Sequence, residues 1–176
     1  MKGLSKISGE EIDKITDKTS DYFLRMIKKD STDIDFSVLE KRLKIKYMRD
    51  CHSAMFLDGR KGMRIIVDHG IAEQWSEINC KTEIRIFEKC GIKVCDYIIG
   101  EKVYSYVIQP EEKFYKELEK TRNTAGFGET IITKSIPQDV LGQIEKTAAG
   151  IGFTLEEILQ LMDENAYITE LRSKMK

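Results

Sequence analysis

The stretch "SAMFLDGRKGMRIIV" at residues 53–67 decides the fold, because two apolar runs flank a polar connection that contains two glycines. Glycine supplies the positive φ that a tight hairpin turn requires, and the flanking runs have the apolar residues of buried strands. The pattern predicts two antiparallel strands joined by "DGRKG" at residues 58–62. An antiparallel sheet is therefore expected at the centre of the chain.

Three further runs with strand character follow the hairpin. They are "TEIRIFE" at residues 82–88, "IKVCDYII" at residues 92–99 and "KVYSYVI" at residues 102–108. In the first run, Ile84 and Ile86 alternate with charged residues, which is the pattern of a half-exposed strand. A short helix is expected just before it, at residues 71–78. The sequence thus predicts an antiparallel sheet of four or five strands.

Helices are predicted before and after this sheet. Apolar residues recur at helical spacing over residues 9–29, and Ser8 with Glu11 has the pattern of a capping box at the helix start. Residues 36–43 and 111–122 show shorter helical patterns. The predicted fold class is therefore α+β, with a helical N-terminus, a central antiparallel sheet and a helical C-terminal unit.

Three regions are expected along the chain. They are an α+β core domain over residues 1–122, a linker or extra strand over residues 123–136, and the helical C-terminal unit over residues 137–176. The middle region begins with "NTAGFGET", which is small, polar and glycine-bearing, as linkers are. It ends with "TIITKS" at residues 130–135, which has strand character.

The C-terminal unit contains "KTAAGIGFTLEEILQLMDEN" at residues 146–165, which resembles a helix-turn-helix motif. Ala148 lies where two crossing helices need a small side chain, and Gly152 lies where the turn needs positive φ. Thr154 with Glu157 forms a second capping box, at the start of the second helix. This resemblance covers about twenty residues and has low specificity.

The charge of this unit argues against DNA reading by its second helix. Residues 137–165 hold six acidic residues against the single Lys146, and the second helix begins with Glu156 and Glu157. Carboxylates near a duplex are repelled by the phosphates and release no counterions. We therefore expect a helical hairpin that packs on the sheet or on a partner.

Positive charge gathers between residues 41 and 64, where eight cations face two acids. The predicted binding residues are Lys41, Arg42, Lys44, Lys46, Arg49, Arg60, Lys61 and Arg64. A patch of this kind suits a nucleic-acid backbone or an acidic protein surface. Two alternatives are a solvated helix face with a charged hairpin tip, and pairing of these cations with the chain's own acidic hairpin.

The four cysteines are expected to be reduced thiols with structural roles. Cys80, Cys90 and Cys95 with His69 form a three-cysteine, one-histidine set of the kind that binds zinc. However, four residues separate Cys90 from Cys95, which is wider than a zinc knuckle, and on one strand these two side chains would lie on opposite faces. We therefore predict no metal and no cofactor.

No catalytic motif is present in the sequence. Cys51 and His52 are adjacent, and neighbouring strand residues cannot easily form a nucleophile–base pair. Asp68, Glu83 and Lys102 supply the residue types of an acid-dependent nuclease, but no pattern in the chain groups them. The residues therefore favour a protein without catalytic activity.

Composition sets limits on where and how the protein acts. The formal net charge is −1, the N-terminus lacks a signal-peptide core, and no apolar run could span a bilayer, so a cytoplasmic protein without a membrane partner is expected. Abundant isoleucine and lysine are typical of low-GC bacteria, their phages and mobile elements.

Three functions are compatible with these observations. The first is a non-catalytic regulatory protein or inhibitor that binds a protein or nucleoprotein partner. The second is a DNA-binding transcriptional regulator that uses residues 41–64 and dimerises through its C-terminal helices. The third is a thiol- or metal-dependent enzyme or sensor. A basic and an acidic pole on one chain are also suited to a homodimer.

Overall fold

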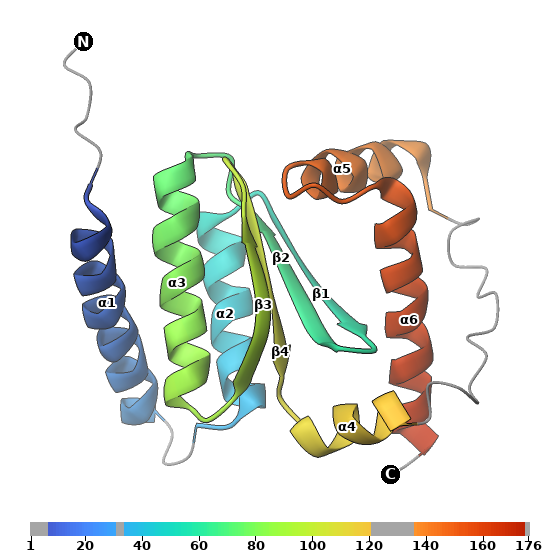
Figure 1. Cartoon of the computed structure of the whole chain (residues 1–176), viewed down its shortest axis with the longest axis horizontal. Helices are drawn as coiled ribbons and strands as arrows, with labels where there is room; N and C mark the ends of the chain where they lie inside the picture. Colours follow the sequence, from blue (N-terminus) through green and yellow to red (C-terminus); the bar gives the residue numbers. More distant parts are fainter. Residues whose placement is uncertain (1–6, 31–33, 121–135, 175–176) are drawn as a thin grey trace.

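The computed structural model describes residues 7–30, 34–120 and 136–174. The helices are α1 (Gly9–Asp30), α2 (Phe36–Asp50), α3 (Glu73–Lys89), α4 (Glu112–Lys120), α5 (Gln138–Ala149) and α6 (Leu155–Lys174), and the strands are β1 (Ser53–Gly59), β2 (Gly62–Asp68), β3 (Lys93–Ile99) and β4 (Val103–Gln109). A four-stranded antiparallel sheet forms the centre (Figure 1). Helices α2 and α3 cover one face, α1 lies against α3 as an outer layer, and α5 and α6 lie at the other face. The predicted α+β class is confirmed.

The hairpin predicted at residues 53–67 is present. Strands β1 and β2 pair along their whole lengths, and Arg60 and Lys61 form the turn between them. Gly62 ends this turn with a φ of 143°, which side chains rarely adopt. A Cβ at Gly62 would also lie 2.5 Å from the carbonyl oxygen of Ile108 in β4. Glycine is therefore required where the hairpin meets the neighbouring strand.

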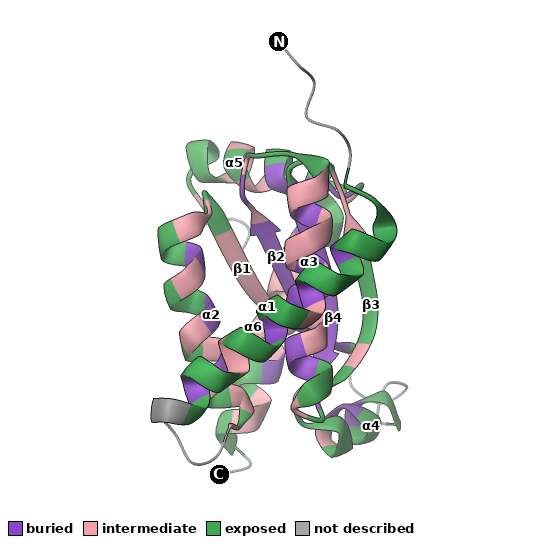
Figure 2. Cartoon of the chain, turned by 90° about the vertical axis from the view of Figure 1, so that its left-hand side faces the viewer, coloured by how far each residue is buried: buried purple, intermediate pink, exposed green. Residues whose placement is uncertain are grey.

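The strand order β1-β2-β4-β3 makes β2 and β4 the central strands. Figure 2 shows both as largely buried, while β3 at the edge is largely exposed. The pairing of β3 with β4 shifts register between Val94 and Asp96, which is a β-bulge. A bulge and charged residues on an edge strand both hinder pairing with other chains. The strands predicted at residues 92–99 and 102–108 are confirmed.

The prediction of a strand at residues 82–88 is wrong, because this segment is the second half of α3. Buried residues recur along one side of the helix at helical spacing: Ser76, Cys80, Glu83 and Phe87. Another side carries ion pairs to α1, from Lys81, Arg85 and Lys89 to Asp13, Asp17 and Asp21. Because the sheet and α1 both cover α3, apolar residues lie on two sides of this helix. Along the sequence they alternate with charged residues, as they would in a half-exposed strand. The short helix predicted at residues 71–78 is the first part of the same helix.

The sheet separates two hydrophobic clusters, because successive strand residues point to opposite faces. The cluster under α2 and α3 includes Ile65, Val67, Tyr104, Tyr106, Leu39, Leu43 and Phe87. The cluster under α5 and α6 includes Leu57, Ile66, Val103, Ala148, Ile151 and Ile158. Both faces of the sheet are therefore covered by helices, and the C-terminal unit shares a core with the sheet.

The first helices begin as their sequences predict. At the start of α1, the backbone N–H of Ser8 donates a hydrogen bond to the Glu11 carboxylate at 3.0 Å, which completes the capping box. At the start of α2, the Asp35 carboxylate accepts a hydrogen bond from the N–H of Val38 at 2.9 Å. Helix α2 is longer than predicted and continues to Asp50.

The helical hairpin predicted in the C-terminal unit is present as α5 and α6. Gly152 in the turn has a φ of 77°, and Ala148 is fully buried where the two helices cross. The N–H of Thr154 donates to the Glu157 carboxylate at 2.7 Å, and the Thr154 hydroxyl accepts from the N–H of Glu157 at 3.2 Å. The local features that predicted this hairpin are therefore confirmed.

Asp58 ties α4 and α6 to the end of β1. Its buried carboxylate accepts hydrogen bonds from Tyr115 of α4 and from Arg172 of α6. Its backbone N–H donates to the side-chain oxygen of Asn165 at 2.8 Å, and the Arg172 guanidinium lies 4.7 Å from the centre of the Phe114 ring. These contacts hold the C-terminal unit along the first strand.

Two further predictions concern the linker and membrane-spanning helices. The linker or extra strand predicted at residues 123–136 lies outside the described residues except for its last position. Among the helices that the structure describes, none is both long enough and apolar enough to cross a bilayer.

The approach of α5 to the β3–β4 connection can be tested with two glycines. A Cβ at Gly100 would overlap the carbonyl oxygen of Gly150 at the end of α5, whereas a Cβ at Gly142 in the middle of α5 would meet no atom within 4 Å. We expect Gly100→Ala to lower the free energy of unfolding by about 2 kcal/mol through overpacking. We expect Gly142→Ala to raise it by up to about 1 kcal/mol through helix propensity. Urea unfolding measures both, and an unchanged Gly100→Ala stability would contradict the close packing.

Candidate functional site

Helix α2 carries five of the eight predicted binding cations: Lys41, Arg42, Lys44, Lys46 and Arg49. Its inner face is apolar and lies in the core with α3 and the sheet, through Leu39, Leu43 and Tyr47. On its outer face, Ile45 is 53% exposed and Met48 is 87% exposed. The helix therefore presents apolar residues both to the core and to solvent.

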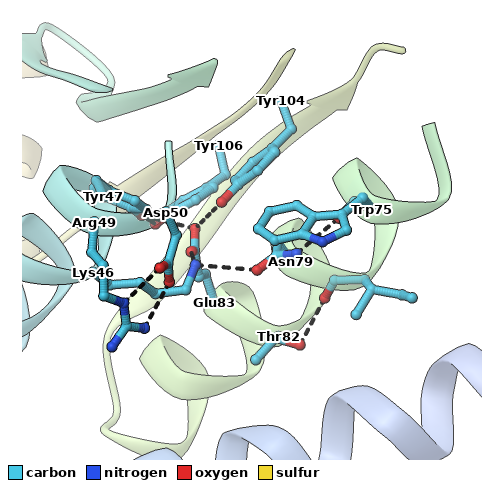
Figure 3. A network of polar contacts seen from close by, with 11 residues as sticks. Lys46, Tyr47, Arg49, Asp50, Trp75, Asn79, Thr82, Glu83, Tyr104 and Tyr106 are labelled. Carbon is cyan, nitrogen blue, oxygen red and sulfur yellow. Dashed lines mark hydrogen bonds and ion pairs between the residues drawn. The ribbon is translucent and has the colours of Figure 1, made fainter. Parts of the chain in front are cut away.

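Glu83 of α3 is the centre of a buried polar network at the inner face of α2 (Figure 3). One carboxylate oxygen accepts hydrogen bonds from the hydroxyls of Tyr47 at 2.8 Å and Tyr104 at 2.9 Å. The other oxygen accepts from the Lys46 ammonium group at 2.8 Å. The hydroxyl of Tyr106 lies 3.1 Å from that of Tyr47. One carboxylate thus joins α2, α3 and β4.

Charge within this network is balanced by a single ion pair. Burial acts to lower the pKa of Lys46, but the charge of Glu83 and the hydrogen bond to it outweigh burial and raise that pKa. Burial, reinforced by the Glu83 charge, holds the pKa of Tyr47, Tyr104 and Tyr106 well above the usual value. Tyr47, Tyr104 and Tyr106 therefore contribute neutral hydroxyls to the network at physiological pH, and Lys46 contributes an ammonium group.

Lys46 is consequently turned away from any external partner. Besides Glu83, its ammonium group donates to the side-chain oxygen of Asn79 at 3.1 Å and lies 5.8 Å from the centre of the Trp75 ring. Its side chain is 21% exposed. Of the predicted binding residues, Lys46 is therefore an internal contact that attaches α2 to α3.

The arginines of the β1–β2 hairpin also make internal contacts. Arg60 forms an ion pair with Glu164 of α6 at 3.3 Å. Arg64 donates to the hydroxyl of Ser105 in β4 at 2.9 Å and pairs with Asp96 of β3 at 3.3 Å. The Arg64 guanidinium also lies 5.0 Å from the centre of the Phe153 ring. These two arginines lie at the seam between the sheet and α6, where the chain's own acidic hairpin meets the basic stretch.

The structure therefore divides the predicted basic stretch between two places. Lys41, Lys44 and Arg49 are exposed on α2, and Lys61 is exposed at the hairpin tip. Lys44 pairs with Glu40 and Arg49 with Asp50 on the same helix. Such exposed pairs contribute at most about 1 kcal/mol each. An external acidic group can therefore replace Glu40 beside Lys44 or Asp50 beside Arg49. The outward cations of α2 surround Ile45 and Met48.

A cleft of about 640 Å³ lies beside the hairpin, between α6 and strands β2, β3 and β4. Its floor includes Arg64, Val107 and Asp96, and its wall includes Phe153 and Leu161. The volume is within the range of small-molecule sites. However, Arg64 and Asp96 form an ion pair with each other, so this pair directs no net charge into the cleft.

The geometry of α6 argues against its use as a DNA-recognition helix. Ile158 and Ile168 are buried, and Arg60 and Asn165 add polar contacts between this helix and β1 or the hairpin. Its N-terminal turn exposes Glu156 to solvent. A recognition helix needs an exposed face of donors that can reach bases and phosphates. In α6, the buried side packs against the sheet, and the exposed N-terminal turn is acidic.

The cysteines are dispersed over the fold. Cys80 is buried in α3, Cys90 caps the end of the same helix, and Cys95 is exposed on β3. Cys90 and Cys95 do not share one strand, because β3 begins only at Lys93. Across the described residues, no group of three histidine, cysteine or acidic side chains is placed to hold a metal ion.

The thiols lack the environment of a nucleophile. Burial raises the pKa of Cys51 to about 11 and that of Cys80 further still. Burial also raises the pKa of Cys90 and Cys95. A reactive cysteine needs a lowered pKa, because the thiolate is the nucleophile. These raised pKa values favour the protonated thiol at neutral pH.

His69 and Ser76 are in contact but do not form a nucleophile–base pair. The backbone N–H of Ile71 donates to Nδ1 of His69 at 3.0 Å, so the neutral ring carries its proton on Nε2. Nε2 lies 2.6 Å from the Ser76 hydroxyl, which donates onward to the carbonyl oxygen of Glu101 at 3.2 Å. Burial lowers the pKa of His69, which favours this neutral form. The histidine donates to the serine and cannot deprotonate it.

Sequence reasoning missed the network around Glu83. It considered Glu83 with Asp68 and Lys102, but the structure pairs Glu83 with Lys46, Tyr47 and Tyr104 instead. Tyr104 and Tyr106 are two residues apart on one strand and therefore share a face, which was an available signal. The positions of Lys46 and Glu83 depend on how α2 and α3 pack, which no local pattern states.

The worth of the buried pair can be measured with a double-mutant cycle. Glu83→Gln leaves the Lys46 ammonium group partly buried without its counter-ion, and we expect a loss of about 3 kcal/mol in the free energy of unfolding. Adding Lys46→Met should recover part of that loss, since the unpaired charge is then removed. Glu88→Gln, at an exposed position of the same helix, is the control and should change little. If the changes in unfolding free energy caused by the two single substitutions simply add in the double variant, measured by urea unfolding, Glu83 and Lys46 are not directly coupled.

The hairpin offers a matched pair of charge reversals. Arg60, whose side chain is 32% exposed, faces Glu164, which is 13% exposed, whereas the neighbouring Lys61 is exposed to solvent. Arg60→Glu places two like charges together, and we expect a loss of about 1–2 kcal/mol in stability. Lys61→Glu should stay within about 0.5 kcal/mol. Thermal and urea unfolding measure both, and equal effects would show that Arg60 is not part of an internal seam.

Comparison with known proteins adds no assignment. No protein-family model, curated protein or solved structure matches the chain significantly. A functional proposal for this protein therefore depends on the geometry and chemistry of its own residues.

Proposed function

We propose that this protein is a non-catalytic regulatory protein that binds a protein partner through the outer face of α2. The α2 face, as we name it, consists of Lys41, Lys44, Ile45, Met48 and Arg49. The observation that carries the proposal is the exposure of Met48, at 87%, in the last turn of a helix whose other side is fixed in the core. An apolar centre rimmed by charged residues is typical of a protein–protein interface.

The chemistry of the α2 face indicates an acidic partner. Ile45 and Met48 offer apolar area that a partner's apolar residues would cover, and methionine adapts well to a partner's shape. Lys41, Lys44 and Arg49 surround them with positive charge. The Glu83 network holds the helix in one position, so little ordering of α2 accompanies binding. A protein surface with carboxylates around an apolar patch is therefore the complementary partner.

A DNA-binding regulator is the second candidate, and fewer contacts support it. Lys46, Arg60 and Arg64 are directed to carboxylates within the chain, which leaves few outward cations for phosphates. Duplex binding draws most of its affinity from many such cations. Exposed Ile45 and Met48 would gain nothing from phosphates. The α2 face therefore suits a protein better than a duplex.

An exchange of one apolar residue for a charge tests the proposal. We expect Met48→Glu to abolish capture of the partner, because it places a carboxylate in the apolar centre opposite an acidic surface. Tyr22→Glu is the matched control, since Tyr22 is 61% exposed but lies on α1. Affinity capture from cells that express the tagged full chain, with quantitative mass spectrometry, compares the variants. Circular dichroism checks that both are folded.

The outcomes separate the two candidates. A protein captured by the native chain and by Tyr22→Glu, but lost with Met48→Glu, supports the proposal. Equal capture by all three contradicts a role for the α2 face. Binding of a labelled duplex that falls steeply with salt and depends on Lys41 and Lys44 would favour the DNA-binding candidate instead.

A further inference from the structure

We infer that the acidic surface bound by the α2 face is the α5–α6 hairpin of a second copy of this chain. This inference rests on the proposed function, because it names the partner for the same surface. It requires that the chain carry an acidic surface complementary to the α2 face, that this surface be exposed, and that a single chain be unable to bring its own two surfaces together.

The α5–α6 hairpin provides the complementary charge. Asp139 and Glu145 of α5 and Glu156 of α6 are all exposed. Val140 lies beside Asp139 and is 38% exposed, which gives this surface an apolar position as well. We call these four residues the acidic face, in which three carboxylates outnumber the single exposed Lys146 of α5. It offers carboxylates to Lys41, Lys44 and Arg49, and an apolar contact to Ile45 and Met48.

The two faces cannot meet within one chain. Helix α2 covers one face of the sheet and the α5–α6 hairpin covers the other, so the whole sheet lies between them (Figure 1). The basic stretch meets the acidic hairpin of its own chain at the hairpin seam, where Arg60 pairs with Glu164. Beyond that seam, the α2 face and the acidic face remain for contact between molecules.

The resulting contact is heterologous, since two different surfaces of the same chain meet. A pair of copies then retains one free α2 face and one free acidic face, unless the arrangement closes into a ring or a two-fold pair. Association should therefore increase with protein concentration. It should also weaken as salt rises, because exposed charges are screened over roughly 8 Å at physiological ionic strength.

The sharpest test uses two full-length variants, each lacking one face. In the first, Lys41→Gln, Lys44→Gln and Met48→Ser remove the α2 face. In the second, Asp139→Asn, Glu145→Gln and Glu156→Gln remove the acidic face. None of these residues belongs to the Glu83 network or the Asp58 contacts. Glu157 is left intact, because it caps α6.

Sedimentation velocity over a concentration series measures association of the native chain, of each variant and of their equimolar mixture. We expect the native chain to associate with itself. Each variant alone should self-associate with an affinity at least about tenfold lower than that of the native chain. The mixture should form a one-to-one dimer and nothing larger, because it contains only one competent pair of faces. A mixture that stays monomeric overturns the inference, as does association that persists unchanged in both variants.

A photo-crosslinking amino acid at position 48 separates this inference from the proposed function. In cells that express the full chain, crosslinks from position 48 to residues 138–160 of a second copy support the inference. Crosslinks to a different protein overturn it and leave the proposed function standing. Crosslinks to neither, with the same probe at position 22 as the control, overturn both.

Discussion

A carboxylate cannot be buried in a protein core without donors, and the placement of Glu83 follows from that constraint. Tyr47 and Lys46 from α2 and Tyr104 from β4 supply the donors, so these elements must adopt one relative position. Apolar packing alone would tolerate small shifts of α2 along the sheet, whereas hydrogen bonds do not. The network thereby fixes which side of α2 is buried and which side faces solvent.

Asp58 imposes a similar constraint at the end of β1. Its carboxylate accepts from Tyr115 and Arg172, which lie on α4 and α6. The C-terminal helices are thus held to the first strand by a charged contact and by the apolar cluster around Ile66 and Ile158. Two buried acids therefore attach helices to the sheet: Glu83 holds α2 and α3 to β4, and Asp58 holds α4 and α6 to the end of β1.

These internal contacts also select which cations remain for function. Lys46, Arg60 and Arg64 are used within the chain, where their partners are carboxylates of α3, α6 and β3. The outward charge that remains on α2 surrounds Ile45 and Met48. A stretch that appears in the sequence as one basic patch is therefore an internal seam in one part and an exposed surface, which we propose binds a partner, in another. That division is what favours a protein partner over a duplex.

Local chemistry in the sequence determined the hairpin at residues 53–67, both capping boxes and the positive φ of Gly152, because each depends on residues within a few positions of one another. The α+β class followed from the order of these local patterns. Residues 82–88 were misjudged because α3 is covered on two sides, and only packing against α1 and the sheet creates that environment. The tertiary structure alone decided the partners of Glu83, Asp58 and Arg60. These ion pairs and hydrogen bonds join residues far apart in the chain, and their geometry exists only once the helices have packed on the sheet.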